Sequence, residues 1–318
     1  MSFASDARGE MVRERVDQPC CARAELAAAL LLGGGIGFRG RDRYALSVVS
    51  AEASVVRHCF VLLKSFFGVT GEMRTLRTQQ LRGGTRYQLL LPEADGRAVL
   101  NACGLLDAEA LFGVRATPAP EALRYACCRK AFLRGAFLLA GAVSDPERGY
   151  HLEFAAPNEA LADFVIELLN YFEIFAKKAC RKSRYVVYLK RGEQIADALA
   201  LMGAKNAMMA LENVRVKKDV RNRVNRQLNC DERNLARQVE NAQAQLEDIE
   251  CIRREMGLEK LPPTLREMAR VRAEHADDSL ASLGEFCDPP IGKSGVHSRL
   301  RRLRKIADSL RTGEEKHI

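Results

Sequence analysis

The chain has 318 residues, of which 47% are hydrophobic and 29% charged, and 50 Lys and Arg against 41 Asp and Glu give a net charge of +9. This composition is typical of a globular protein, and the length suits about two domains. The longest apolar run, residues 26–32, is far shorter than the roughly 18 residues that a membrane span needs. The N-terminal segment carries Asp6, Glu10 and Glu14 and no apolar signal sequence. We therefore expect a cytoplasmic protein with no membrane partner.

The positive charge is concentrated in two blocks of the sequence. Residues 181–226 carry a net charge of +8 and residues 289–318 a net charge of +5, whereas residues 231–288 between them carry −6. Basic residues gathered on particular elements are typical of proteins that bind nucleic acid. The alternative, above all for the first block, is a set of solvated helix faces that bind nothing.

The 10 cysteines are expected to be mostly free thiols in a reducing compartment. No Cys-x-x-Cys occurs, but there are two vicinal pairs, Cys20–Cys21 and Cys127–Cys128. Two such pairs could build a zinc site, although adjacent cysteines rarely hold one tetrahedral ion well. The spacing favours small buried residues near helix starts instead, so we predict no metal ligands and no cofactor.

Residues 35–40 read GIGFRG, a literal G-x-G-x-x-G. A dinucleotide-binding loop has this motif between a strand and the following helix, so that the helix N-terminus meets the phosphates. Here the order is reversed. Residues 22–32 are rich in Ala and Leu, which predicts a helix, and the alternation from Tyr44 to Val48 predicts a strand. The glycines therefore end a helix and bind no nucleotide.

One stretch of the sequence recurs 107 residues later. LAAALLLGG at 26–34 matches LRGAFLLAG at 133–141, and a vicinal cysteine pair precedes each segment. Each copy continues with a strand (from Tyr44 or Tyr150), a long amphipathic helix (50–67 or 156–172), a strand (86–92 or 184–190) and a shorter helix ending at Leu106 or Met202. This pattern predicts a tandem duplication. Small residues would let the two matched helices approach closely, namely Ala27, Ala28, Gly33, Gly34, Gly135, Ala136, Ala140 and Gly141.

The two matched segments resemble the paired LAGLIDADG helices of homing endonucleases. In that family two αββαββα halves pack through these helices, and an acidic residue just before the last glycine holds the catalytic metal. Gly33 and Ala140 stand at those positions here, and neither can ligate a metal. The resemblance implies that the fold is kept, that no catalytic residue remains and that the nuclease activity is lost. The alternative is an acid that reaches in from elsewhere, such as Asp42 or Asp145.

Residues 210–234 are basic and polar, which is typical of a linker or an exposed arm. Asn229 and Glu232 fit a helix-capping box, and Gly257 suits the end of the helix that follows. An apolar stripe on this helix predicts a core face, and a short coiled-coil dimer is the alternative. The stripe consists of Leu235, Val239, Ala242, Leu246, Ile249 and Met256.

Three further helices are predicted near the C-terminal end. Pro262-Pro263 interrupts the chain, and Thr264 with Glu267 fits a second capping box. The helix that it opens should turn Leu265, Met268 and Ala269 inward. A short helix over 279–286 should share one apolar side, formed by Leu280, Leu283 and Phe286. Asp288-Pro289-Pro290 then forces a turn, and Ser294 is a suitable N-cap for the last helix.

The last helix has an apolar side and a basic side. The apolar side consists of Val296, Leu300, Leu303, Ala307 and Leu310. A short helix, a turn and a basic-faced helix form the layout of a helix-turn-helix. Its DNA-binding residues are expected to be Lys293, Ser294, His297 and Ser298 near base edges, and Arg299, Arg301, Arg302, Arg304 and Lys305 on or near phosphates. The alternative is a basic terminal helix that stays in water.

Three segments carry a resemblance that covers nearly the whole chain. CCRKAFLRGAFLLAGAVSDPERGYHLE, VRNRVNRQLNC and PPIGKSGVHSRLRRL closely resemble the WhiA family of bacterial transcription and cell-division regulators. The resemblance implies an α+β fold. A duplicated, nuclease-inactive αββαββα LAGLIDADG-like domain would cover residues 1–218, with repeats over about 20–107 and 127–218. An all-α helix-turn-helix domain would cover residues 219–318.

The same resemblance implies a function, a sequence-specific DNA-binding regulator of sporulation or cell division with an effect on chromosome segregation in some members. Its partner would be double-stranded promoter DNA in the nucleoid, and some members work with a WhiB-type iron–sulfur regulator. A competing hypothesis is an enzyme, a residual metal-dependent nuclease or other nucleic-acid hydrolase on the same scaffold. A third is a protein-interaction module whose duplicated domain contacts a protein. The uncharged residues at Gly33 and Ala140 favour a protein that is not an enzyme.

Overall fold

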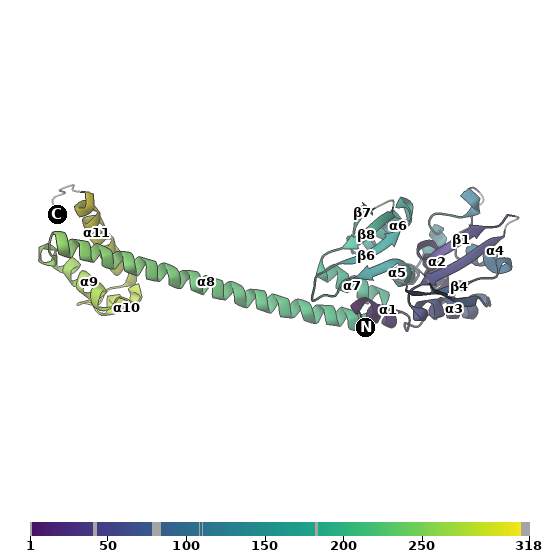
Figure 1. Cartoon of the computed structure of the whole chain (residues 1–318), viewed down its shortest axis with the longest axis horizontal. Helices are drawn as coiled ribbons and strands as arrows, with labels where there is room; N and C mark the ends of the chain where they lie inside the picture. Colours follow the sequence, from purple (N-terminus) through teal and green to yellow (C-terminus); the bar gives the residue numbers. More distant parts are fainter. Residues whose placement is uncertain are drawn as a thin grey trace. The chain divides into compact units, whose positions relative to one another are not determined.

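The computed structural model describes residues 2–40, 43–77, 84–107, 109, 111–181 and 184–312. The chain divides into two compact units, Met1–Asp219 and Val220–Ile318, each with its own hydrophobic core. Figure 1 labels helices and strands of both units in chain order. Among the described helices, none is both long and apolar enough to cross a membrane.

The first unit contains two copies of one αββαββα arrangement, preceded by α1 (Phe3–Met11). The first copy comprises α2 (Pro19–Leu32), β1 (Gly34–Phe38), β2 (Tyr44–Ser50), α3 (Ala53–Phe67), β3 (Glu72–Arg77), β4 (Thr85–Leu90) and α4 (Glu93–Ala102). The second comprises α5 (Ala126–Ala140), β5 (Gly141–Val143), β6 (Leu152–Ala156), α6 (Glu159–Asn170), β7 (Lys177–Arg181), β8 (Arg184–Leu189) and α7 (Gly192–Met202). Two short 3-10 helices, η1 (Leu111–Gly113) and η2 (Pro120–Leu123), lie between the copies in sequence. The predicted α+β fold with a duplicated αββαββα domain is confirmed.

Each copy has a four-stranded antiparallel sheet, and the two sheets share one strand order, β1-β2-β4-β3 and β5-β6-β8-β7. On the inner strands of the first sheet, Val48 lies opposite Gly34 on one side and Leu89 on the other. Buried and half-buried residues alternate along β2 and β6. This period of two means that one face of each sheet packs on the core.

The helices and strands that the residue pattern predicted are present in both copies, whereas four more strands were expected only from the αββαββα arrangement that the resemblance implied. These are β1, β3, β5 and β7. β1 consists mostly of glycines, and β3 is exposed at every position, so neither has the alternation that identifies a strand. Gly33 caps α2 as predicted, whereas the glycines after it pair with β2 and do not form a loop.

Helices α2 and α5 pack closely against each other through small residues (Figure 1). A Cβ atom placed on Gly135 of α5 would lie 2.5 Å from the carbonyl oxygen of Glu25 and 3.1 Å from Cβ of Ala28, both in α2. A Cβ atom on Gly33 would overlap the side chain of Leu139. Glycine is therefore required where the two helices meet, and the predicted close approach is confirmed. At Gly34 and Gly141 the constraint is local, because a Cβ atom there would meet the chain's own preceding helix.

A buried ionic network joins the two copies beside this helix contact. Glu25 of α2 accepts hydrogen bonds at Oε2 from Nε (3.0 Å) and Nη2 (2.5 Å) of Arg134 in α5. Its Oε1 lies 2.7 Å from Nε2 of His58 in α3. Burial alone would raise the pKa of Glu25, but the hydrogen bond with His58 and the charge of Arg134 outweigh it and hold that pKa below its ordinary value. The network thus ties α2, α3 and α5 together.

Helix α8 (Lys205–Glu255) is continuous over 51 residues. It contains no Gly or Pro, and Lys, Arg, Glu and Gln are good helix formers, so nothing in the sequence stops it. The predicted helix start at a capping box of Asn229 and Glu232 is therefore wrong. Residues 210–234, expected to be a linker or an exposed arm, are helical, but they contain the boundary between the two units and residues 219–241 are exposed. The predicted core face is confirmed only near the helix end, where Ile249 is buried, whereas Leu235 and Val239 are each 61% exposed.

The second unit consists of the end of α8, η3 (Leu258–Lys260), α9 (Pro263–Glu274), α10 (Leu280–Glu285) and α11 (Lys293–Thr312). Leu265, Met268 and Ala269 are buried in its core as predicted. The capping box of Thr264 and Glu267 is wrong, because α9 begins after Pro262 with no side-chain cap. α11 begins at Lys293, one residue before Ser294, so Ser294 is not the N-cap.

Candidate nucleic-acid interface

Helices α10 and α11 are joined by a tight turn over residues 286–292. The amide of Ile291 donates to the carbonyl of Gly284 at 2.9 Å, which closes the turn on α10. A Cβ atom on Gly284 would overlap the carbonyl of Ile291, so only glycine fits at this approach. The predicted turn at Asp288-Pro289 is present and has a cis peptide bond. The order of short helix, turn and basic helix matches the predicted helix-turn-helix.

The carboxylate of Glu267 in α9 holds both the turn and α11. Its Oε1 accepts a hydrogen bond from the amide of Asp288 at 2.7 Å. Its Oε2 accepts one from Nη1 of Arg299 at 3.0 Å, in an ion pair whose side chains are 19% and 21% exposed. At the other end of α11, Nη1 of Arg311 donates to Oδ1 of Asp248 in α8 at 2.7 Å. These three contacts fix the orientation of α11 in its unit, and none of them was predicted from the sequence.

The connection between α9 and α10 is fixed by a buried arginine. Arg272 donates from Nη1 to the carbonyl oxygens of Asp278 (2.9 Å) and His275 (3.4 Å). Burial lowers the pKa of Arg272, and the nearby carboxylates oppose that shift. The ring of His275 stacks on Phe286 with centroids 3.8 Å apart. One face of the Phe286 ring is covered by His275, and the side chain remains 48% exposed. Leu283 is buried in the core as predicted.

The predicted apolar side of α11 faces the core of the second unit. Val296, Leu300, Leu303 and Ala307 are buried, and Leu310 packs against the same cluster. Eight of the nine predicted DNA-binding residues are exposed, namely Lys293, Ser294, His297, Ser298, Arg301, Arg302, Arg304 and Lys305. Arg299 is the exception because it pairs with Glu267. The geometry gives Arg299 an anchoring contact inside the protein.

The exposed residues of α11 form two adjacent strips. Lys293, His297, Arg301 and Arg304 line a groove between α11, the α9–α10 region and the end of α8. Ser298, Arg302 and Lys305 lie farther round the helix and outside this groove. Within the described part of the chain, the five basic side chains Lys293, Arg301, Arg302, Arg304 and Lys305 have no ion-pair partner. This leaves a strongly positive, solvated helix surface next to the turn.

Comparison with known proteins agrees with this architecture. The chain matches the family models WhiA N-terminal LAGLIDADG-like domain over residues 19–106, WhiA LAGLIDADG-like domain over 129–221 and WhiA C-terminal HTH domain over 224–307. It is 41% identical to the probable cell division protein WhiA of Desulforamulus reducens, over 100% of this chain and 98% of that protein. Identity to the probable cell division protein WhiA of Heliobacterium modesticaldum is 40% over 97% of each.

The chain belongs to the WhiA family. Its fold also matches the crystal structure of full-length DUF199/WhiA from Thermatoga maritima, with a TM-score of 0.60 and 23% identity over 97% of this chain and 98% of that one. The resemblance drawn from the three sequence segments is confirmed, as is the helix-turn-helix at the C-terminal end.

The two positions that the LAGLIDADG resemblance assigns to catalytic acids lie at the ends of α2 and α5. Gly33 caps α2, and Ala140 is the last residue of α5. A side chain at Gly33 would overlap Leu139, so the packing leaves no room there for a carboxylate. Asp145 accepts a hydrogen bond from the amide of Glu147 in its own turn at 3.0 Å, and Asp42 lies outside the described residues.

The first basic block of the WhiA chain is divided between the second sheet and α8. Arg181 lies on β7 and Arg184 on β8. On α8, Nζ of Lys218 donates to the carbonyl oxygens of Pro146 (2.6 Å) and Glu147 (2.9 Å). Part of this block therefore holds the protein together, unlike the solvated basic residues of α11.

Proposed function

We propose that this chain is a sequence-specific DNA-binding transcription regulator and that α11 is its recognition helix. The observation that carries the proposal is the surface of α11, where five basic side chains without ion-pair partners in the described chain stand beside Ser294, His297 and Ser298. Charged donors of this kind suit phosphates, and short polar donors near the start of the helix suit base edges in the major groove.

The family supports a role in cell division, since the relatives compared above are named probable cell division proteins. We extend this to the control of promoters that act in division, sporulation and chromosome segregation, with the protein bound to the nucleoid. A WhiB-type iron–sulfur partner is implied by the family resemblance alone, and co-purification of the full chain with such a protein tests it.

The test compares variants of α11 on target and scrambled duplexes by fluorescence anisotropy at several salt concentrations. Target duplexes are taken from fragments enriched by chromatin precipitation of the full-length protein. Arg302→Ala or Lys305→Ala removes a phosphate contact, so binding should weaken about equally on both duplexes. The slope of log affinity against log salt should then shrink by about one.

Substitutions near the start of the helix should act differently. His297→Ala or Ser298→Ala should reduce discrimination between target and scrambled DNA by about 1–3 kcal/mol. Arg253→Ala is the matched control, because Arg253 is an exposed arginine of the same unit that lies on α8 and pairs with Glu250. If a fragment ending at residue 218 bound target DNA as tightly as the full chain, α11 would not be the reader.

The competing hypothesis is a metal-dependent nuclease, which needs metal-binding carboxylates. Gly33 and Ala140 do not provide them. We infer that the chain does not cleave DNA. A plasmid-nicking assay with Mg²⁺ or Mn²⁺ tests this directly, and cleavage that a chelator abolishes would refute it. Gly33→Asp is not expected to restore cleavage, because the new side chain would clash with Leu139 and disturb the helix pair.

A further inference from the structure

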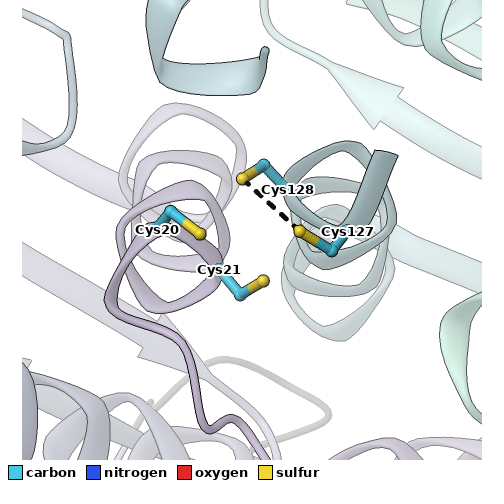
Figure 2. Close-up of side chains that lie close together, drawn as sticks. All are labelled: Cys20, Cys21, Cys127 and Cys128. Carbon is cyan, nitrogen blue, oxygen red and sulfur yellow. Dashed lines mark hydrogen bonds between the residues drawn. The ribbon is translucent and has the colours of Figure 1, made fainter. Parts of the chain in front are cut away.

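Four cysteines come together at the start of the helix pair in the first unit. Cys20 and Cys21 lie in the first turn of α2, and Cys127 and Cys128 lie in the first turn of α5. Figure 2 shows one pair on each helix, with the sulfur atoms of Cys21, Cys127 and Cys128 at the facing sides of the two helices and that of Cys20 over α2. Each copy of the duplicated fold thus contributes one vicinal pair to the same place.

The sulfur atoms are nearly at the spacing of a single tetrahedral metal site. All four lie within 4.8 Å of one another, and Sγ of Cys127 is 4.0 Å from Sγ of Cys128. A zinc–sulfur bond is about 2.3 Å long, so neighbouring sulfurs of a tetrahedral site are about 3.8 Å apart. A contraction of roughly 1 Å or less, available through side-chain rotation, brings the cluster to that geometry.

The sequence favoured small buried residues over a metal site because adjacent cysteines seldom chelate one ion. The structure removes that objection. Each vicinal pair supplies only one edge of the tetrahedron, and the packing of α2 on α5 supplies the opposite edge. Cys128 belongs to the core of the first unit, Cys20 and Cys21 are half-buried against that core, and Cys127 is exposed. The cluster therefore extends from the core to the surface, and an ion can reach it from the side of Cys127.

We propose that Cys20, Cys21, Cys127 and Cys128 form a tetrathiolate site for one zinc ion that fastens the starts of α2 and α5 together. Four sulfur ligands in a tetrahedron select zinc among common divalent ions. All four positions are filled by the protein, which is the arrangement of a structural site and leaves none open for a substrate. Binding converts four thiols to thiolates and releases four protons, so the occupied site carries a net charge of −2.

The surroundings of the cluster suit that negative charge. The N-termini of α2 and α5 each present about half a positive charge. The N-cap residues Gln18 and Tyr125 make no side-chain capping hydrogen bond, although the amides of Cys21 and Cys128 already donate to the carbonyl oxygens of these two residues. Arg134, two turns into α5, interacts electrostatically with Cys21. Without a cation, burial and the neighbouring sulfur atoms raise the pKa of Cys21 and Cys128, so the thiolates of this cluster need the charge of a bound metal ion to form together.

Two other uses of four cysteines fit this geometry less well. A four-iron cluster occupies the space among its cysteines and holds their sulfur atoms farther apart than a single ion does. Disulfide formation would need an oxidant, and the first turn of a helix disfavours a bond between adjacent cysteines, so only bonds across the helices would remain. Both are outcomes that the experiment separates from zinc binding.

The test uses the full chain, purified under reducing conditions, stripped with a chelator and titrated with Zn²⁺ alone. We expect one zinc per chain by elemental analysis. Substituting Co²⁺ should give the visible absorption of a tetrahedral cobalt thiolate. Cys127→Ser is the main variant because that side chain is exposed. It should weaken zinc binding by roughly a hundredfold or more, since losing only a hydrogen-bond partner of a ligand already costs about 10–100-fold. Cys180→Ser, an exposed cysteine of β7 in the same unit, should leave binding unchanged.

Alkylation followed by mass spectrometry provides a second measurement that needs no variant. Zinc should protect Cys20, Cys21, Cys127 and Cys128 together, while the exposed Cys180 and Cys230 stay reactive. The proposal is overturned if zinc does not bind stoichiometrically, if Cys127→Ser binds it as tightly as the parent chain, or if other cysteines are protected. It is also overturned if the four residues are recovered as disulfides from zinc-replete protein.

Discussion

Removing Arg134 should destabilise the first unit more than most single substitutions. The side chains of Arg134 and Glu25 are 9% and 2% exposed, and their atoms approach to 2.5 Å. Arg134→Met leaves the charge of Glu25 buried with only His58 beside it. Breaking a buried pair in this way costs about 3–5 kcal/mol, because the stranded charge keeps its desolvation penalty. For a unit of this size that corresponds to a fall in melting temperature of roughly 6–20 °C.

The assay is intrinsic tyrosine fluorescence of the full chain during denaturation. The chain has no Trp, and its seven tyrosines, at positions 44, 87, 125, 150, 171, 185 and 188, all lie in the first unit. The signal therefore reports on that unit alone. Adding Glu25→Gln to Arg134→Met removes the stranded charge and should recover part of the lost stability.

Arg74→Met is the control, because the side chains of the Arg74–Glu72 pair are 54% and 62% exposed and solvent screens their attraction, so its loss should change the melting temperature little. If Arg134→Met lowered the free energy of unfolding of the first unit by less than about 1 kcal/mol, no costly buried charge would have been left behind. The same conclusion would follow if the double variant Arg134→Met/Glu25→Gln were less stable than Arg134→Met alone.

Three further outcomes are expected. The pKa of Glu25 is lowered in the folded state, so its contribution to stability is complete above the ordinary glutamate pKa of about 4.3 and is lost as pH falls through the lower folded value. Denaturation followed by tyrosine fluorescence should show this decrease in stability at acid pH in the parent chain. In Glu25→Gln the stability should depend less on pH over the same range. Gly135→Val should destabilise the first unit by about 1–3 kcal/mol through overpacking against α2, whereas Gly149→Val, which has open space around it, should change the same fluorescence midpoint little. Leu300→Ala should cost the second unit about 2–5 kcal/mol, seen as faster hydrogen exchange throughout α11, and unchanged exchange there would contradict the buried position of Leu300.

The elements that the sequence predicted correctly are those with a clear period or an internal copy. The apolar side of α11 was predicted residue by residue, because Val296, Leu300, Leu303 and Ala307 recur at helical spacing. The duplication predicted α2 and α5 from their matched segments. Strands β1 and β3 could not be predicted from the residue pattern, because glycines and exposed charges do not alternate with apolar residues; only the family resemblance implied them. β1 is a strand because it pairs with β2, and β3 because it pairs with β4.

Capping residues and side-chain partners were predicted poorly, since each depends on neighbours that are distant in sequence. The position of Glu267 after Thr264 fits a capping box, but its carboxylate accepts hydrogen bonds from the amide of Asp288 and the guanidinium of Arg299 instead. The DNA-binding residues of α11 remain a prediction that the structure makes physically reasonable, with Arg299 as the member that contacts protein. The cysteine cluster could not be judged from spacing alone, because its geometry depends on how α2 meets α5.

The buried network of Glu25 and Arg134 has a consequence for how the two copies recognise each other. At the offset of 107 residues, Glu25 corresponds to Phe132 and Arg134 to Ala27, so the ion pair forms once across the contact and has no mirror image. Two first copies placed face to face would bury two glutamates opposite alanines, with no arginine between them. Two second copies would bury two arginines without a carboxylate. Pairing of like halves would therefore bury unpaired charges, and the ion pair of Glu25 with Arg134 favours the pairing of the two unlike halves.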